Sequence, residues 1–404
     1  MRIFMVHNYY QSTSPSGEDV SFESEAALLE RAGHQVIRYT RHNDEIRDFS
    51  FLEKGAMSWR TVWATNTYRT ITSLIQRHRP DVAHFQNIFP LISPAAYYAC
   101  RAAGVPVVQA VRNYRMICPN GLLSRNGETC ELCPATGSLW HGVVHACYRH
   151  SRVETAVAAT LIGVHRRLGT WHRAVDLFIA TSEFVRRKLM ASGFPRHRIC
   201  VKPNCVFPDP EPGDGEGGYA LFVGRLTGEK GIQTLIRAWL LLRGIPLKLV
   251  GSGPLQHNVA GALGRTTVEL LGRLPPTAVY TLMKRAHVLI VPSECHEAFG
   301  RVAAEAFACA LPVIASRVGG LAEIVRDNVN GLQFTPGNPE DLAAKVAWAF
   351  ENPSALRAMR SHARESYEQC YTPERNSKLL LTAYAAARQN AVTEGKCREY
   401  QTEP

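Results

Sequence analysis

Short apolar runs alternate along the chain with longer stretches whose apolar residues recur at helical spacing. In the first half, the runs at 2–7, 35–39, 82–85, 105–110 and 177–181 predict strands, and 21–32 and 61–76 predict helices between them. Strands that alternate with helices are typical of parallel sheets joined by crossover helices. The pattern therefore favours an α/β fold.

The same alternation restarts after an interruption. Residues 203–218 contain four prolines and four glycines, which break both helix and strand. Beyond them, strands are predicted at 219–223, 247–250, 268–271, 288–291, 313–315 and 332–334, with helices that include 231–242 and 305–310. We expect two Rossmann-like parallel-sheet domains, 1–205 and 206–372, that face each other across a cleft holding the active site. Residues 373–390 are expected to form a helix that crosses back to the first domain, followed by a tail at 391–404.

Composition supports two domains and adds an asymmetry of charge. The 404 residues are 46% hydrophobic, which is enough for two cores. The net charge is +11, and residues 1–205 alone hold 25 Lys and Arg against 15 Asp and Glu. Such a basic half predicts an anionic partner, for which we weigh a membrane surface, a phosphorylated acceptor and nucleic acid. A solvated basic face without a partner is the alternative.

We recognise no targeting signal in the sequence. We find no apolar run long enough to span a bilayer, and the first residues lack the pattern of a signal peptide. We expect a cytoplasmic protein, with peripheral contact to the inner face of the plasma membrane through the basic clusters at 166–167 and 186–188. The eleven cysteines are then expected to be thiols or metal ligands.

Three glycine-containing turns follow predicted strands of the second half. Gly224, Arg225 and Lys230 occupy the first turn, just before a helix, where cations and helix-start amides favour a diphosphate. Gly251 belongs to the second turn, and Arg273-Leu274 to the third, where backbone can meet a nucleobase. Ordinary tight turns with surface cations would give the same local pattern.

Two glutamates mark a further strand end. Glu297 and Glu305 are eight positions apart, with Phe299-Gly300 between them at an expected helix start. The helix amides favour an anion, and the two carboxylates can bracket a nucleotide sugar. A second interpretation, a dipole partner and a solvated glutamate, stays open from the spacing alone.

Over residues 1–390 the chain resembles the retaining glycosyltransferases of family 4, which have the GT-B fold. The segments that carry the resemblance are Gly224-Arg-Leu-Thr-Gly-Glu-Lys-Gly231, the E-x7-E segment from Glu297 to Glu305, and Leu311-Pro-Val-Ile-Ala315. The resemblance is specific in the second half and looser in the first. It implies a transferase that moves a sugar from a nucleoside diphosphate to a glycan or a lipid-linked glycan, as in cell-surface polysaccharide biosynthesis.

The resemblance also implies roles for individual residues. Arg225 and Lys230 would hold the donor diphosphate, and Glu305 the ribose hydroxyls. Glu297 would contact the donor sugar, with Ala298, Phe299 and Gly300 beside it, and Arg273-Leu274 would lie next to the base. Cations and helix amides aimed at the leaving diphosphate stabilise its developing charge without Mg²⁺, so we expect no essential metal at the catalytic centre.

The first half departs from the family pattern in two places. His7 begins a loop that resembles the family's phosphate- and acceptor-contacting loop, but only Gly17 stands where relatives often have two glycines. Arg112, followed by Asn113, stands where many relatives have a histidine, and arginine cannot serve as a general base. This residue implies either an altered donor or acceptor, or reduced activity. His84 is a further acceptor-side candidate, with a structural hydrogen bond as the alternative.

A cysteine-rich insert is expected at about 113–150. Cys118, Cys130, Cys133 and Cys147 include one C-x2-C pair and can supply four thiolates to a structural zinc, with free thiols in an acceptor-side lid as the alternative. Two rival functions are kept at this stage. One is a catalytically weak nucleotide-sugar-binding module, suggested by Arg112. The other is a nucleic-acid-binding protein, which the charge suggests but no motif supports, so that we expect no nucleic-acid partner.

Overall fold

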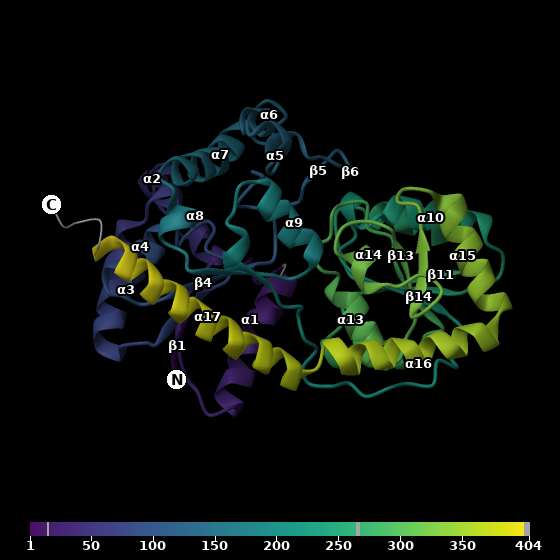
Figure 1. The fold of residues 1–404 in the computed structure, drawn as a ribbon. Coiled ribbons are helices and arrows are strands. Elements are labelled where there is room, and N and C mark those ends of the chain that lie inside the picture. The colour runs from purple at the N-terminus through teal and green to yellow at the C-terminus, as the bar shows by residue number, and fades with distance from the viewer. Residues whose placement is uncertain (14–15, 264–266, 400–404) are drawn as a thin grey trace. The chain divides into compact units, whose positions relative to one another are not determined.

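The computed structural model describes residues 1–13, 16–263 and 267–399, with the side chains of these residues except 51, 52, 54, 260–263 and 394–399. The chain divides into two compact units (Figure 1). The first comprises Met1–Leu122, Glu131–Lys202 and the chain from Asn376 onward, and the second comprises Leu123–Cys130 and Pro203–Arg375.

The first unit is built on a six-stranded parallel sheet in the order β2-β1-β3-β4-β7-β8. Its strands are β1 (Arg2–Tyr9), β2 (Gln35–His42), β3 (Val82–Phe85), β4 (Val107–Val111), β7 (Leu177–Ala180) and β8 (Ile199–Val201). Every residue of β3, β4 and β7 is buried, which is typical of central strands covered on both faces. Of these strands, only β8 was not predicted from the sequence.

The helices of this unit precede, link and follow its strands. They are α1 (Gly17–Arg31), α2 (Phe51–Val62), α3 (Thr65–His78), α4 (Ala95–Ala102), α5 (Leu132–Thr136), α6 (Trp140–Val144), α7 (Arg152–Arg167), α8 (Thr170–Arg173) and α9 (Glu183–Ala191), with 3-10 turns η1 (Asn43–Arg47) and η2 (Arg196–Arg198). The single helix expected at 61–76 is wrong. Trp63 and Ala64 are extended there, and the Ala64 N–H donates to Ser93 Oγ at 2.9 Å, so the chain turns between α2 and α3.

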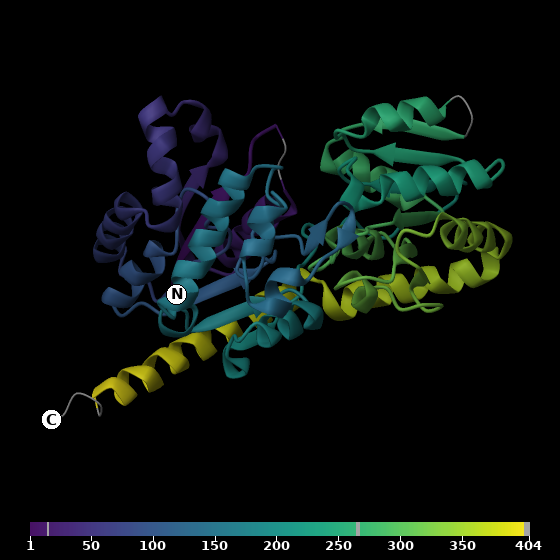
Figure 2. The same cartoon turned by 90° about the horizontal axis from the view of Figure 1, so that it is seen from above.

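The second unit repeats the architecture with the strand order β11-β10-β9-β12-β13-β14. Its strands are β9 (Ala220–Val223), β10 (Leu247–Val250), β11 (Val268–Gly272), β12 (Val288–Val291), β13 (Val313–Ser316) and β14 (Gly331–Phe334). Its helices are α10 (Ile232–Leu241), α11 (Gln256–Leu263), α12 (Pro276–Arg285), α13 (Arg301–Ala308), α14 (Leu321–Ile324), α15 (Pro339–Glu351) and α16 (Pro353–Cys370), with η3 (Gly228–Lys230) before α10 (Figure 2). The helix expected at 305–310 therefore begins four residues earlier and ends at residue 308.

Successive residues of the second sheet enter two separate cores. Leu221, Leu289 and Val313 belong to one core, and Phe222, Ile290 and Ile314 to the other. This alternation follows from the period of two of a β-strand, whose side chains point to opposite faces. Two parallel-sheet α/β domains are thus present, as the alternation of strands and helices predicted.

A two-stranded hairpin, β5 (Ser124–Arg125) and β6 (Glu128–Thr129), interrupts the insert. Its turn is Asn126-Gly127, with φ of 55° and 87°. Positive φ at both positions is what a tight hairpin turn requires and what Asn-Gly supplies, so this dipeptide is a hairpin signal that the sequence analysis missed.

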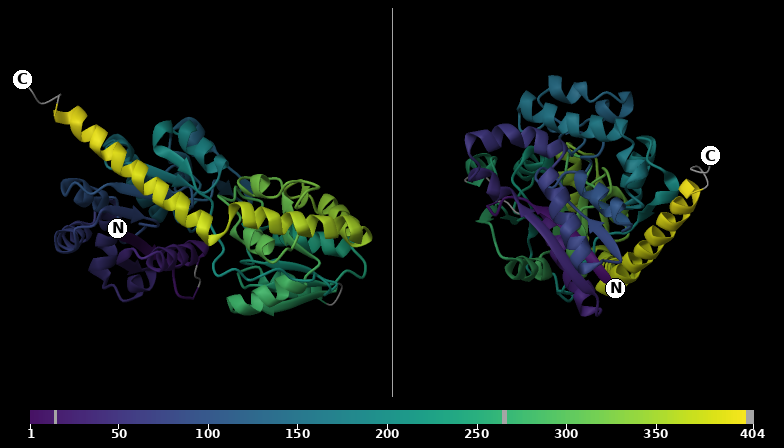
Figure 3. Two further views of the ribbon diagram at one scale, coloured as in Figure 1. Left: turned by 60° about the horizontal axis from the view of Figure 1, so that its bottom comes forward. Right: turned by 90° about the vertical axis from the view of Figure 1, so that its left-hand side faces the viewer.

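The last helix, α17 (Pro373–Glu399), completes the first unit (Figure 3). Leu380, Ala383, Tyr384 and Ala387 are buried in the same core as Ile3 of β1 and Phe22 of α1. The helix therefore covers the sheet face that α1 also covers. In the described part of the chain, no helix combines the length and the apolar content that crossing a membrane requires.

A histidine is buried under α17. His84 of β3 has no exposed surface, and its Nδ1 lies 2.9 Å from the Tyr384 hydroxyl. Burial lowers the pKa of His84 to about 4; Glu25 raises it, while Arg112 and Lys202 lower it further. The folded state therefore holds this imidazole neutral at pH values where an unfolded chain protonates it.

We predict that the stability of the first unit falls as the pH drops from 7 to 5. An unfolded histidine has a pKa near 6.5, so the unfolded state gains protons in this window while folded His84 does not, which costs about 2 kcal/mol of unfolding free energy. Chemical denaturation at the two pH values measures the loss in the wild type and in His84→Asn. The variant should lose less stability by about this amount, and equal losses in both proteins would remove His84 as the cause.

Candidate active site

Four connections meet at the carboxyl end of the second sheet. The Gly224 N–H donates to Val250 O at 3.0 Å, and the Gly251 N–H donates to Gly272 O at 2.8 Å. The Glu294 N–H, in the connection after β12, donates to Glu229 O at 3.0 Å. The three glycine-containing turns predicted from the sequence are therefore held together, and the connection that carries Glu297 joins them.

Two of these glycines allow a backbone approach that no other residue permits. Gly231 has a φ of 67°, and a Cβ there would lie 1.7 Å from the carbonyl oxygen of Pro292. A Cβ on Gly251 would lie 1.8 Å from the carbonyl oxygen of Gly224. Both distances are far inside van der Waals contact, so a side chain would force the connections apart.

Lys230 and Glu297 form an ion pair at this edge. The Lys230 ammonium donates to Glu297 Oε1, and Ser293 Oγ donates to the same oxygen at 2.7 Å. The two side chains are only 27% and 16% exposed. Burial raises the pKa of Glu297, but Lys230 and the hydrogen bond from Ser293 lower it more strongly, so the carboxyl is ionised at neutral pH. Burial lowers the pKa of Lys230, but Glu297 raises it more, so Lys230 stays a cation.

Arg225 lies close to this pair without joining it. Its Nη2 atom is 3.2 Å from Glu229 Oε1, and its side chain is more than half exposed. The guanidinium nevertheless contributes to lowering the pKa of Glu297, which places the three predicted catalytic residues in one electrostatic environment. Burial, followed by the charge of Glu297, raises the pKa of the neighbouring Cys295 thiol to about 12, so the thiol stays protonated at neutral pH.

A second glycine pair holds the backbone of Glu297. The Gly320 N–H donates to Glu297 O at 2.7 Å, and a Cβ on Gly319 would lie 2.6 Å from that oxygen. The sequence analysis did not include Gly319-Gly320 or Ser293. A glycine pair directly after the apolar strand β13 was the available signal for the first, but a lone serine offered none.

Glu305 lies in the second turn of α13, where the sequence placed it. Gly300, with a φ of 95°, caps the helix, and the ring of Phe299 is buried against Tyr371. Arg301 Nε donates to Glu305 Oε1 at 2.7 Å, and neither side chain is more than one-fifth exposed. Glu305 is therefore not a solvated surface glutamate, and Arg301 is a charged residue of this site that the sequence analysis missed.

The remaining donor-side candidates of the second half lie in two connections of the same sheet edge. Arg273 and Leu274 directly follow β11, and the Leu274 side chain packs against the core. Ala298 lies between Glu297 and Phe299 in the same connection. The positions predicted in the second half thus lie in adjacent connections of one sheet edge.

His7, an acceptor-side candidate of the first unit, is fixed by a hydrogen bond. The buried His7 places its Nε2 atom 2.8 Å from Asp19 Oδ1, and Asp19 also accepts from the Ser16 N–H at 2.9 Å. Gly17 is the first residue of α1, capped by Ser16. His7 therefore contacts the first turn of α1.

Arg112 is held inside the first unit. Its Nη2 donates to Glu25 Oε1 at 2.8 Å and its Nε to Gln86 Oε1 at 3.0 Å, and its side chain is 6% exposed. Lys202 Nζ is 2.6 Å from the same Glu25 oxygen. Burial raises the pKa of Glu25, but Lys202 and Arg112 lower it more, so the carboxyl stays ionised. Asn113, next to Arg112, donates to Glu18 Oε1 at 2.8 Å.

The four cysteines of the insert are the candidate zinc ligands that the spacing suggested. Cys118, Cys130, Cys133 and Cys147 are thiols, and among the described residues no group of three or more His, Cys, Asp or Glu side chains is placed to hold a metal ion. The zinc that their spacing suggested therefore stays a prediction. Cys118 Sγ instead lies 3.0 Å from Asn120 Oδ1.

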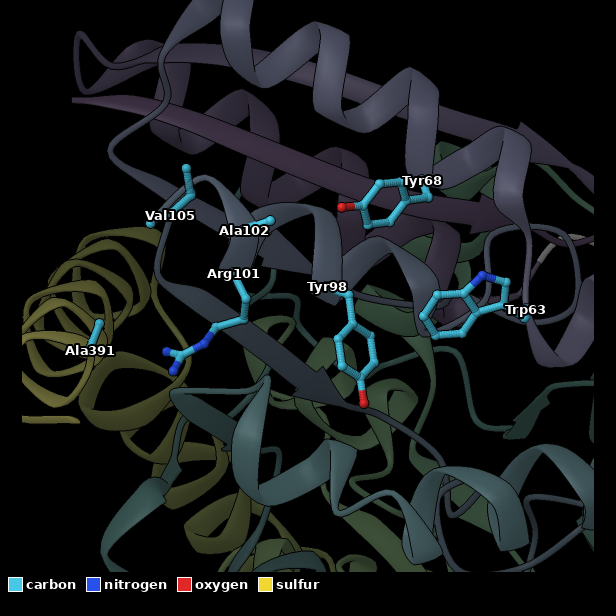
Figure 4. Close-up of a pocket in the computed structure, with 8 residues that line it drawn as sticks. Trp63, Tyr68, Tyr98, Arg101, Ala102, Val105 and Ala391 are labelled. Carbon is cyan, nitrogen blue, oxygen red and sulfur yellow. The ribbon is translucent and has the colours of Figure 1, made fainter. Parts of the chain in front are cut away.

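A cavity of about 670 Å³ lies elsewhere in the first unit (Figure 4). It is lined by Trp63, Tyr68, Tyr98, Arg101, Ala102, Gly104, Val105 and Ala391. Gly104 and Val105 precede β4, so the cavity opens near the amino end of that strand. Arg101 is paired with Asp176 at 3.1 Å, and none of the residues predicted for the site lines this cavity.

Two family models match the chain. Residues 16–205 match the glycosyl transferase 4-like domain, and residues 208–366 match glycosyl transferases group 1. Two uncharacterised glycosyltransferases of Methanocaldococcus jannaschii are 34% identical over 48% of this chain and 57% of theirs, and 35% identical over 41% and 44%. The chain thus spans about half the length of these two curated relatives.

Solved structures share the fold at lower identity. Anabaena HepE in complex with UDP superimposes with a TM-score of 0.66 at 20% identity, over 95% of this chain and 100% of that one. Together the two family models cover most of the chain, and each matches a parallel-sheet α/β unit. The chain therefore belongs to the glycosyltransferase family that these models describe, with the GT-B fold.

Proposed function

We propose that the chain transfers a sugar from a nucleoside diphosphate sugar to a glycan or lipid-linked glycan, with retention of the anomeric configuration. The observation that carries the proposal is the cation pair Arg225 and Lys230 beside Glu297, at the same sheet edge as the start of α13. HepE, which shares the fold, is bound to UDP in its crystal structure, and this supports a nucleoside diphosphate as the leaving group.

The proposed mechanism follows from charge. Breaking the bond between sugar and phosphate leaves negative charge on the nucleoside diphosphate. Lys230, Arg225 and the first amides of α13 would meet that charge as it develops, and so stabilise the transition state more than the ground state. Glu297 accepts from Lys230 and Ser293 through Oε1, so its second oxygen can accept a hydroxyl of the donor sugar.

Glu305 would bind the ribose in this proposal. A carboxylate accepts hydrogen bonds from two adjacent hydroxyls, and Arg301 orients it by holding Oε1. In this proposal the acceptor is an intermediate of cell-surface polysaccharide biosynthesis. The transfer takes place in the cytoplasm, at the inner face of the plasma membrane. No essential metal is proposed at the catalytic centre, because the chain's own cations supply positive charge there.

One experiment tests the proposal and separates it from a weaker alternative. Thermal unfolding is followed with uridine, guanosine and adenosine diphosphate sugars, because a ligand that binds the folded state raises the midpoint. One nucleotide series should raise it, and mixing that donor with acceptor lipid extract should release the nucleoside diphosphate. The second candidate is a donor-binding module with little turnover, which the burial of Arg112 against Glu25 suggests. Donor binding without release of nucleoside diphosphate would favour this second candidate.

We predict that Lys230→Ala lowers kcat/KM about 100-fold or more. The variant loses a cation aimed at the leaving diphosphate, and single electrostatic groups of this kind contribute factors of about 100 to 1,000. Release of nucleoside diphosphate measures the effect, with Lys345→Ala on α15 as the charge-matched control. Comparable rates in the two variants would exclude Lys230 from catalysis.

We predict that Glu305→Ala weakens binding of the nucleoside diphosphate about tenfold, because the hydroxyls it holds lose a charged acceptor. Titration calorimetry with the nucleotide found in the screen gives the dissociation constant. Glu351→Ala, at the exposed end of α15, removes the same charge away from the site and should bind like the wild type. An unchanged dissociation constant in Glu305→Ala would contradict the ribose role.

A further inference from the structure

Three helices of the first unit, α2, α6 and α7, lie together in one layer (Figure 1). α7 packs against both α2 and α6. Val62, Leu161 and Ile162 are buried at this contact, with Leu139 packed against them. The sides of the three helices that face one another therefore bury apolar side chains.

All three helices nevertheless also expose large apolar side chains. Trp59 of α2 is 71% exposed and Trp140 of α6 is 68% exposed. Val144 of α6, Val153 and Val164 of α7, and Leu168 directly after α7 are also exposed. We call these six side chains the helical-layer surface. Exposed tryptophan of this extent does not serve folding, and an apolar surface of several residues marks a site of interaction.

The charge around the helical-layer surface is strongly positive. Residues 132–173 contain five arginines and one carboxylate, Glu154. Glu154 lies 3.7 Å from Arg149, with both side chains about half exposed. Arg152 is the first residue of α7, where the helix dipole disfavours a cation, so local helix stability does not explain it. Arg152 and Arg167 are both exposed.

The other basic cluster of the first unit is largely neutralised within the chain. Arg186 is paired with Glu183 at 3.0 Å, and Lys188 with Glu131 at 2.6 Å. The arginines beside the helical-layer surface therefore offer more unbalanced charge than residues 186–188, although the sequence suggested both clusters equally.

Tryptophan and arginine together have a specific chemical preference. An indole ring has an apolar body and a polar N–H and is enriched at the boundary between lipid headgroups and acyl chains. Arginines nearby are attracted by anionic headgroups. A second copy of the chain would instead bring the same positive charge to this surface, which opposes self-association.

We propose that the helical-layer surface docks the chain on a bilayer that contains anionic phospholipids, with Trp59 and Trp140 at the headgroup boundary. This deepens the proposed function, because it assigns the membrane partner to one surface, and it rests on that function only for the lipid-linked acceptor. The arginines around α7 provide the electrostatic attraction, and the apolar side chains provide the burial.

The test is co-sedimentation of the full chain with vesicles of phosphatidylcholine alone and of phosphatidylcholine with phosphatidylglycerol. The wild type should sediment with the anionic vesicles only, and less at high salt. Trp59→Ser combined with Trp140→Ser should lower the partition coefficient about tenfold or more, because the two rings that would be buried in the bilayer are lost. Arg152→Gln combined with Arg167→Gln should lower it roughly fivefold for each charge.

Matched controls exist on α10 of the second unit. Leu240 and Leu241 are 52% and 55% exposed, and Arg237 and Arg243 beside them are exposed cations. Leu240→Ser with Leu241→Ser, and Arg237→Gln with Arg243→Gln, should leave the partition coefficient unchanged. Equal losses in these controls, no loss in the tryptophan variant, or no sedimentation of the wild type would each overturn the proposal. So would a dimer that the tryptophan variant abolishes.

Donor binding is measured on the same proteins. The tryptophan and arginine variants should keep the donor-induced rise in unfolding midpoint of the wild type, which also shows that they are folded. If no donor raises the midpoint while the vesicle results hold, the proposed function fails and the membrane surface stands. If the donor binds and the vesicle results fail, the reverse follows.

Discussion

The ion pair between Lys230 and Glu297 joins two connections at the carboxyl end of the second sheet, and the candidate site depends on it. The two residues are 67 positions apart and come from different connections of the sheet. The pair forms because Gly231 lets the first connection approach the carbonyl of Pro292, and because the Gly320 N–H holds the backbone of Glu297. Each charge sustains the other at low exposure, so removing one would leave the other poorly solvated.

In the first unit, part of the positive charge is buried. It contains most of the positive charge of the chain, but Arg112 and Lys202 are turned inward and share Glu25. A count of basic residues therefore overstates the surface available to an anion. What distinguishes the arginines around α7 is that they lie on exposed helices with one carboxylate among them.

The strands could be predicted from the sequence because a covered parallel sheet needs mainly apolar runs, and those at 82–85, 247–250 and 288–291 match β3, β10 and β12 residue for residue. The break between α2 and α3 could not, because it depends on a hydrogen bond from Ala64 to Ser93, which is distant in sequence.

The candidate site shows the same division. Gly224, Lys230, Glu297 and Glu305 follow from local pattern and resemblance, since each lies in a connection after a strand or in the first two turns of a helix. Ser293 and Arg301 contribute through single side-chain contacts that no periodicity indicates. The cysteine spacing suggested a metal, but thiol spacing along a chain does not determine whether the loop brings the sulfur atoms together.

The buried cluster of the first unit connects these observations to α17. Two cations already share one carboxylate there, so a third positive charge on His84 would raise the cost of burying them. Arg112 and Lys202 indeed lower the pKa of His84 in addition to its burial. Tyr384 approaches the neutral ring with a hydroxyl, which can hydrogen-bond to an imidazole without carrying charge. The last helix of the chain thus covers the sheet with apolar residues and also contacts His84, a titratable group that stays neutral beside the charged cluster.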